Sequence, residues 1–194
     1  MEDVGIFALA IQFSGIFNII VAAFDVALLP YYYQTAKKKK GKKEIGKLST
    51  IVMAVLGFVL ILILLLSKPL ILLLVKNVNY HPAINCIPLL LLANGFRLIF
   101  KIFHLNLMYS KKTKIISTLR GLSSLLFIIL LGFFMEMNNL GINSVAISLI
   151  VVNIILAVIS FILSQHYFKV EYELKKIFYI FVVLFTIGLF NLNF

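Results

Sequence analysis

The stretch KKKKGKKEIGK, residues 37–47, separates two long apolar runs and decides which class of protein this is. Val4–Tyr33 precedes the stretch and Leu48–Val75 follows it. Each run exceeds the roughly 20 residues with which a helix crosses about 30 Å of hydrocarbon. Seven lysines between two such runs indicate a basic loop in water, residues 35–47, because lysine inside a bilayer is costly. The pattern therefore predicts two membrane-crossing helices joined by this loop.

Four further apolar runs follow toward the C-terminus. They are Ala83–Tyr109, Ile115–Met135, Gly141–Phe168 and Ile177–Phe190, of which the last is the shortest. The chain is 62% hydrophobic and only 13% charged, which leaves too few polar side chains to cover a water-soluble core. We therefore predict an all-α integral membrane protein in which residues 1–194 form one domain of six transmembrane helices.

The basic residues sort between alternate gaps of this six-segment pattern. Seven lie in loop 35–47, four lie in or just after loop 110–114, and three lie in loop 169–176. Loops rich in Lys and Arg stay on the cytoplasmic side of a membrane. The sorting predicts that these three loops are cytoplasmic, that the N- and C-termini are outside, and that the protein is a multi-pass protein of the plasma (inner) membrane.

The net charge of +11 also fits a membrane protein. The basic residues flank apolar runs and do not form a face interleaved with exposed aromatics, which argues against a nucleic-acid partner. Anionic membrane lipid is the partner that such loops favour. The eight tyrosines fall at or near the ends of the predicted spans, as in the aromatic belts of membrane proteins.

The second and third predicted spans each contain a proline away from their ends. The second meets Pro69, so it either ends near Ser67 or continues as a longer helix. The third carries Pro88 and then Asn94-Gly95 at mid-depth. Irregular backbone at membrane depth needs protein or a water-filled cavity beside it, so we expect the third span to line a cavity.

Three cationic or titratable side chains are spaced along one face of that third span. Arg97, Lys101 and His104 follow the i, i+4, i+7 pattern of a single helix face. One interpretation is a stripe that faces a cavity and attracts an anionic substrate. The other is that Lys101 and His104 reach the cytoplasmic headgroups while Arg97 pairs within the protein.

Asp25 is the one acidic residue well inside a predicted span. It lies about as far from the cytoplasmic end of the first span as Lys101 does from that of the third. An ion pair between these two spans is one interpretation, because an unpaired charge in the membrane is costly. A carboxylate that couples transport to a cation is the other.

Side chains suited to catalysis do not cluster in this sequence. His81, His104 and His166 stand far apart, and Cys86 is the single cysteine. We therefore predict no enzyme activity, no catalytic residue, no metal site and no cofactor.

Several short stretches resemble a known transporter family. They are EDVGIF at 2–7 with Leu29-Pro30-Tyr31, YHPA at 80–83 with IPLL at 87–90, YSKKTK at 109–114 and LGINSVA at 140–146. In their order along the chain they resemble the polysaccharide-exporter branch (O-antigen flippase, Wzx-type) of the multidrug/oligosaccharidyl-lipid/polysaccharide (MOP) flippase superfamily. The resemblance covers nearly the whole chain but only the C-terminal one of the two lobes that these transporters have.

The resemblance implies a fold and a function. It implies part of the second lobe of a MOP/MATE-type transporter, hence either a fragment or a chain that needs a partner chain to supply the missing lobe. The implied function is export of polysaccharide units, with polyprenyl-diphosphate-linked oligosaccharide as substrate and Arg97, Lys101 and His104 as candidate substrate contacts. Alternatives are a cation-coupled multidrug exporter of the same superfamily, with Asp25 as the coupling residue, and a non-transporting membrane subunit or inactive remnant.

Overall fold

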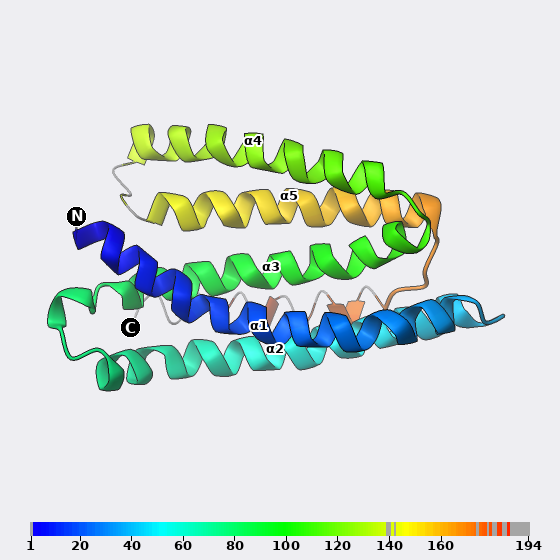
Figure 1. Cartoon of the computed structure of the whole chain (residues 1–194), viewed down its shortest axis with the longest axis horizontal. Coiled ribbons are helices and arrows are strands. Elements are labelled where there is room, and N and C mark those ends of the chain that lie inside the picture. The colour runs from blue at the N-terminus through cyan, green and yellow to red at the C-terminus, as the bar shows by residue number, and fades with distance from the viewer. Residues whose placement is uncertain are drawn as a thin grey trace.

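The computed structural model of the chain describes residues 2–138, 141, 143–173, 175–177, 179, 182–183 and 186. Five long helices account for most of them (Figure 1). They are α1 (Glu2–Ala36), α2 (Gly41–Leu74), α3 (Ala83–Tyr109), α4 (Thr113–Asn138) and α5 (Asn143–Tyr167), with a short 3-10 helix η1 (Val78–Tyr80) before α3. All five are long and apolar enough to cross a membrane. The prediction of an all-helical chain with several potential spans is confirmed for this part of the molecule.

The sixth predicted span, Ile177–Phe190, lies largely outside the described residues. Only positions 177, 179, 182, 183 and 186 of it belong to them, so the count of six spans stays a prediction.

The predicted basic loop 35–47 is wrong in its extent. Helix α1 continues to Ala36 and α2 begins at Gly41, so only residues 37–40 connect them. Hydropathy finds the part of a helix that lies in hydrocarbon, whereas lysine and glutamate are good helix formers that extend α2 into water. Ile45 anchors this extension because its side chain is fully buried. The connection is tight at Gly41, where a Cβ would lie 2.1 Å from the carbonyl oxygen of Thr35.

Pro69 does not end the second helix. Helix α2 runs through it to Leu74, so the longer of the two expected forms is the one observed. Ser67 Oγ, two residues earlier, is buried and donates to the carbonyl oxygen of Leu64 at 2.7 Å. Helix α3 likewise continues through Pro88.

The connections with most basic residues gather at one end of the bundle (Figure 1). We call it the basic end and define it by residues 37–40, 110–112 and 168–173. The N-terminus of α1, η1 and the start of α5 lie at the opposite end. This alternation matches the order of loops predicted from the sequence.

Helix α3 is the central helix of the bundle. It packs against α1, α2 and α5. In its most apolar stretch of 18 residues 72% of the residues are buried, compared with 11% in the corresponding stretch of α4. Helix α4 exposes large apolar side chains such as Ile129 and packs chiefly against α5. Such a surface suits lipid, which is as apolar as the side chains themselves.

Small residues at four-residue spacing let α5 approach α3 closely. Ser144 and Ser148 near the start of α5, and Ser160 and Ser164 near its end, are fully buried. Transmembrane helices pack through such small residues because the backbones can come near each other. The hydroxyls of Ser144, Ser148 and Ser164 donate to carbonyl oxygens of their own backbone.

Candidate functional site

A line of polar contacts runs along the seam between α1 and α3. Each contact joins two residues 74 to 76 positions apart in the chain, so the two helices run parallel with a nearly constant offset. On α1 the residues are seven positions apart and share one face. From the opposite end to the basic end, the pairs are Asn18 with Asn94, Asp25 with Lys101, and Tyr32 with Asn106.

The middle contact is an ion pair two to three turns inside the ends of α1 and α3 at the basic end. Lys101 Nζ lies 2.5 Å from Asp25 Oδ2, and the two side chains are 28% and 40% exposed. The structure thus brings together the two charged residues that share a depth in the sequence pattern. Asp25 balances the charge of Lys101, and Lys101 also lines a cavity.

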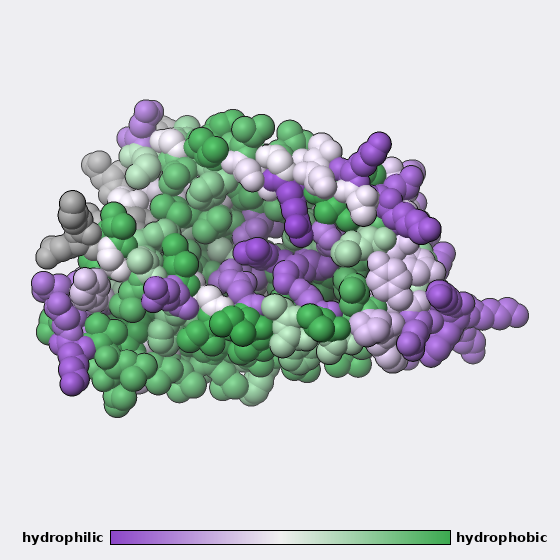
Figure 2. Space-filling view, viewed as in Figure 1, coloured by the Kyte–Doolittle hydropathy of each residue, from purple (hydrophilic) through white to green (hydrophobic). Residues whose placement is uncertain are grey.

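That cavity has a volume of about 660 Å³ and is lined by α1, α3, α4 and α5. Figure 2 shows hydrophilic side chains gathered in a hollow between α4 and α1, within a surface that is mostly apolar. Helix α3 contributes cavity-lining residues between Leu90 and Lys101. The expectation that the third span lines a cavity is therefore confirmed.

Three cationic side chains line this cavity. They are Arg97 and Lys101 on α3 and Arg120 on α4. Among the described residues, neither guanidinium forms an ion pair, and Asp25 is paired with Lys101. The cavity therefore carries an excess of positive charge. Arg120 is a member that sequence reasoning missed, because it was counted with the loop before α4.

Uncharged polar groups complete the lining, and some of them also join helices. Asn94 Nδ2 donates to the carbonyl oxygen of Ser14 on α1 at 3.2 Å. Asn153 Nδ2 on α5 donates to the carbonyl oxygen of Ala93 on α3 at 3.0 Å. Asn18 was also missed, although its seven-residue spacing from Asp25 was a signal that could have found it.

His104 does not line the cavity although it shares a helix face with Arg97 and Lys101. Its side chain is 9% exposed and its ring stands edge-on to Phe100, with 5.4 Å between ring centres. On α3 the cavity lining ends at Lys101, one turn before His104. The structure therefore places two of the three predicted substrate contacts in the cavity, with the third packed beyond it toward the basic end.

The basic end is closed by a hydrogen-bonded amide between two tyrosines. Tyr32 OH donates to Asn106 Oδ1, and Asn106 Nδ2 donates to Tyr172 OH at 2.6 Å. Asn106 is fully buried. Burial raises the pKa of Tyr172 far above its ordinary value, despite the hydrogen bond from Asn106, which lowers it, so the hydroxyl keeps its proton.

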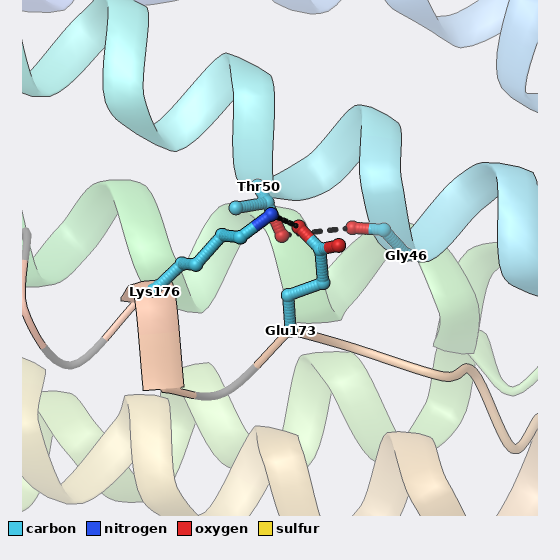
Figure 3. A network of polar contacts seen from close by, with 4 residues as sticks. All are labelled: Gly46, Thr50, Glu173 and Lys176. Carbon is cyan, nitrogen blue, oxygen red and sulfur yellow. Dashed lines mark hydrogen bonds and ion pairs between the residues drawn. The ribbon is translucent and has the colours of Figure 1, made fainter.

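Segment 168–173 brings Tyr172 into this position after α5 ends. It lies against the start of α2, where a Cβ on Gly46 would come within 1.9 Å of the carbonyl oxygen of Glu171. Figure 3 shows Glu173 and Lys176, 2.9 Å apart, beside the turn of α2 that holds Gly46 and Thr50. Only glycine leaves room for this close approach, so the segment fits tightly onto α2.

A second hollow, of about 670 Å³, lies at the opposite end of the same four helices. Its lining is mostly apolar, with Val4 and Phe7 on α1 and Met135 on α4. The polar cavity begins about one turn further along α1, at Ile11. A polar site and an apolar one therefore follow each other along one seam of the bundle.

In comparisons with known proteins, no protein-family model matches the chain, and no curated protein and no solved structure matches it.

Proposed function

We propose that this chain forms one wall of a membrane transporter that moves an anionic, lipid-linked oligosaccharide from the cytoplasmic to the outer leaflet of the plasma membrane. The observation that carries the proposal is the cationic cavity between α1, α3, α4 and α5, in which Arg97 and Arg120 have no carboxylate partner among the described residues. The resemblance of the sequence to O-antigen flippases supports the same function.

The cost of these charges is the physical argument for a ligand. An arginine at the centre of a spanning helix costs roughly 2.5–3.5 kcal/mol on insertion scales, so such residues face water, protein or a substrate pathway. Two guanidiniums and an ammonium around one cavity suit a diphosphate, whose oxygens accept charge-assisted hydrogen bonds from arginine. The amides of Asn18 and Asn153 beside them suit the hydroxyl groups of a sugar.

The open side of the cavity suggests what completes the transporter. In transporters that alternate access, two repeats rock around a site that lies between them. We propose that a second set of helices, in a partner chain or in the same polypeptide, covers the hollow between α1 and α4. Helices packed there would enclose the substrate and cover polar side chains that otherwise face lipid.

Two alternatives receive less support from the cavity. A multidrug exporter driven by cation binding needs a carboxylate that is free to hold the cation, whereas Asp25 is 2.5 Å from Lys101. A non-transporting subunit or inactive remnant gives no reason for the two arginines that line the cavity without a carboxylate partner in the described part of the chain.

A binding measurement tests the proposal. The probe is a short-chain polyprenyl diphosphate that carries one sugar, added to the purified chain in lipid nanodiscs. Replacing Arg97 and Arg120 together by Gln should weaken binding at least about tenfold, which corresponds to 1.4 kcal/mol. The control replaces Lys76 and Lys114 by Gln, which removes the same charge from exposed positions outside the cavity. Equal loss in both double variants would overturn the proposal, because it would reduce the effect to net charge.

A second experiment tests the proposed orientation. A reporter that is active only in the cytoplasm should work when inserted near Gly41 or Lys112, at the basic end, and fail near Asn139. A working reporter near Asn139 would reverse the orientation and with it the direction of transport.

A further inference from the structure

We propose that a second copy of this chain covers the hollow between α1 and α4, in a dimer whose two-fold axis runs along the membrane normal. The inference rests on the proposed function in one respect, since it names the polypeptide that closes the open side of the cavity. Side chains of both copies would then enclose one site, which is incomplete in either copy alone.

The hollow needs a cover other than lipid. Hydrophilic side chains gather in it, within a surface that is mostly apolar (Figure 2). Ionisable side chains at membrane depth normally face protein or water, because lipid cannot solvate them. Helix α4, which forms one side of the hollow, is also the least buried of the five long helices. A partner packed over the hollow would cover both the polar side chains and this helix.

The orientation of the chain restricts how two copies can meet. Both copies insert the same way round, because their basic loops are identical. A closed dimer of such copies has its two-fold axis along the membrane normal. Rotation about this axis preserves depth. Where the axis passes through the hollow, it places α1 of each copy against α4 of the other, so the same contact forms twice.

Charges at one depth make this contact self-complementary. Asp25 lies 2.5 Å from Lys101, which stands eight residues before the end of α3, while Arg120 stands seven residues after the start of α4. The short turn between these helices therefore puts all three at a similar depth. Asp25 shares a face of α1 with Asn18, which lines the cavity, and its side chain is 40% exposed.

The rotation brings Asp25 of each copy toward Arg120 of the other. Each Arg120 thereby gains the carboxylate partner that it lacks among the described residues of its own chain. Arginine has five donors and a long side chain, so it suits such a contact between helices.

Glycines on the same two helices leave room for a close approach. An added Cβ at Gly15 on α1 or at Gly121 on α4 would meet nothing within 4 Å. Glycine weakens a helix relative to alanine, and the packing within one copy gives no reason for it at these positions. Transmembrane helices approach each other through small residues, so both positions suit a helix of the partner copy.

The dimer keeps the site suited to an anion. Among the described residues, each copy brings the cations Arg97, Lys101 and Arg120 and the single carboxylate Asp25 to it. The enclosed space therefore stays positively charged, and an anion between the two copies reduces their mutual repulsion. Diphosphate binding and dimerisation should strengthen each other by the same factor.

Disulfide trapping tests the contact between α1 and α4. Ala22 lies one turn from Asp25, and Ser124 lies one turn from Arg120, both toward the opposite end of the bundle. The two-fold axis therefore places Ala22 of one copy near Ser124 of the other. Ala22→Cys and Ser124→Cys are made in separate chains with different tags, mixed in lipid vesicles and treated with an oxidant. We expect a cross-linked product that carries both tags.

Two features of the design keep this result specific. Both chains also carry Cys86→Ser, so the introduced thiols are the only ones present. The control mixes Ser124→Cys with Val55→Cys, an exposed position on α2, and should give little product with both tags.

A mixture of two charge variants tests the ion pair between copies. Asp25→Asn and Arg120→Gln should each weaken dimerisation about tenfold or more. Energy transfer between labelled chains, at decreasing ratios of protein to lipid, measures this. A mixed dimer of the two variants keeps one intact pair, whereas a dimer of either variant alone keeps none. The mixed dimer should therefore be tighter than either. The control Glu136→Gln, at an exposed carboxylate on α4, should dimerise like the wild type.

The outcomes separate this inference from the proposed function. Equal cross-linking at Ala22 and Val55, no product from either mixture, or a mixed dimer no tighter than the single variants would overturn the inference. Diphosphate binding that needs Arg97 and Arg120 would still leave the proposed function standing. Conversely, specific cross-linking without any binding of the lipid-linked diphosphate probe would overturn the proposed function and leave the dimer in place.

Discussion

The cavity and the basic end both place polar groups in the interior of the bundle, yet they satisfy them differently. At the basic end, Tyr32, Asn106 and Tyr172 pair with one another, and the amide at the centre is fully buried. In the cavity, Arg97 and Arg120 have no ion-pair partner among the described residues and face open space.

The difference separates a structural network from a binding site. Buried polar groups that are fully paired add rigidity and leave little capacity for a ligand. Unpaired cations in a partly open cavity add little to stability and keep their hydrogen-bonding capacity for something else. Changes at the basic end should therefore reduce stability, whereas changes in the cavity should reduce binding.

The largest loss of stability should follow Asn106→Leu. Removing the amide leaves the hydroxyls of Tyr32 and Tyr172 buried without their partner, at a cost of roughly 2–4 kcal/mol for the two groups. The free energy of unfolding in detergent, measured by titration with a denaturing detergent, reports the loss. The matched control Asn79→Leu lies at an exposed position between α2 and α3 and should change this free energy little. Equal losses in the two variants would contradict the structural role of the network.

Gly46→Ala should have the next largest effect. The added Cβ would come within 1.9 Å of the carbonyl oxygen of Glu171, so the backbone of segment 168–173 must move. We expect a cost of roughly 1–3 kcal/mol, as for other overpacked sites. Gly132→Ala is the control, since a Cβ there meets nothing within 4 Å and alanine favours helix over glycine. A neutral Gly46→Ala, measured in the same titration, would show that the segment does not fit tightly onto α2.

The pair of Asp25 and Lys101 should show a smaller coupling. A double-mutant cycle with Asp25→Asn and Lys101→Met should give an interaction of about 1–2 kcal/mol, since the pair is only partly exposed. The surface pair of Lys38 and Glu44, 3.6 Å apart, provides the comparison and should give less than about 0.5 kcal/mol. Strict additivity in the first cycle would mean that the ion pair contributes nothing to folding, whatever its distance.

The smallest effect on stability should come from the cavity arginines. Arg97→Gln and Arg120→Gln should each change the free energy of unfolding by no more than about 0.5 kcal/mol, because these charges have no ion-pair partner among the described residues. A loss of several kcal/mol in either variant would assign that arginine to the structural network and would remove it from the binding site.

The helices could be predicted from the sequence because their signal is local. Apolar runs and alternate basic gaps predicted six spans, and the first five are observed as long helices in the predicted order, since lipid selects for composition over a single helix. The ends were less accurate, because α2 begins seven residues before its apolar run, at Gly41. Lysines that continue a helix into water carry no hydropathy signal.

The site could be predicted only where one helix determined it. Arg97 and Lys101 share a face of α3, and that periodicity places them together. The role of Arg120 depends on how α4 packs across α5, and that of His104 depends on where the cavity ends. Both are tertiary properties, so a helix face alone could find the stripe but could not find its limits.

The separation of α1 and α3 along the chain also has a consequence for biosynthesis. Asp25 is inserted into the bilayer before its partner exists, since Lys101 lies 76 positions further along the chain. At usual rates of translation the ribosome needs roughly 4 to 15 s for that distance. During this time the carboxylate has no partner from α3, so its charge must be neutralised, hydrated or bound by the insertion machinery. The ion pair can form once Lys101 has been inserted. The contacts of α1 with α3 can therefore form only after α3 has been made.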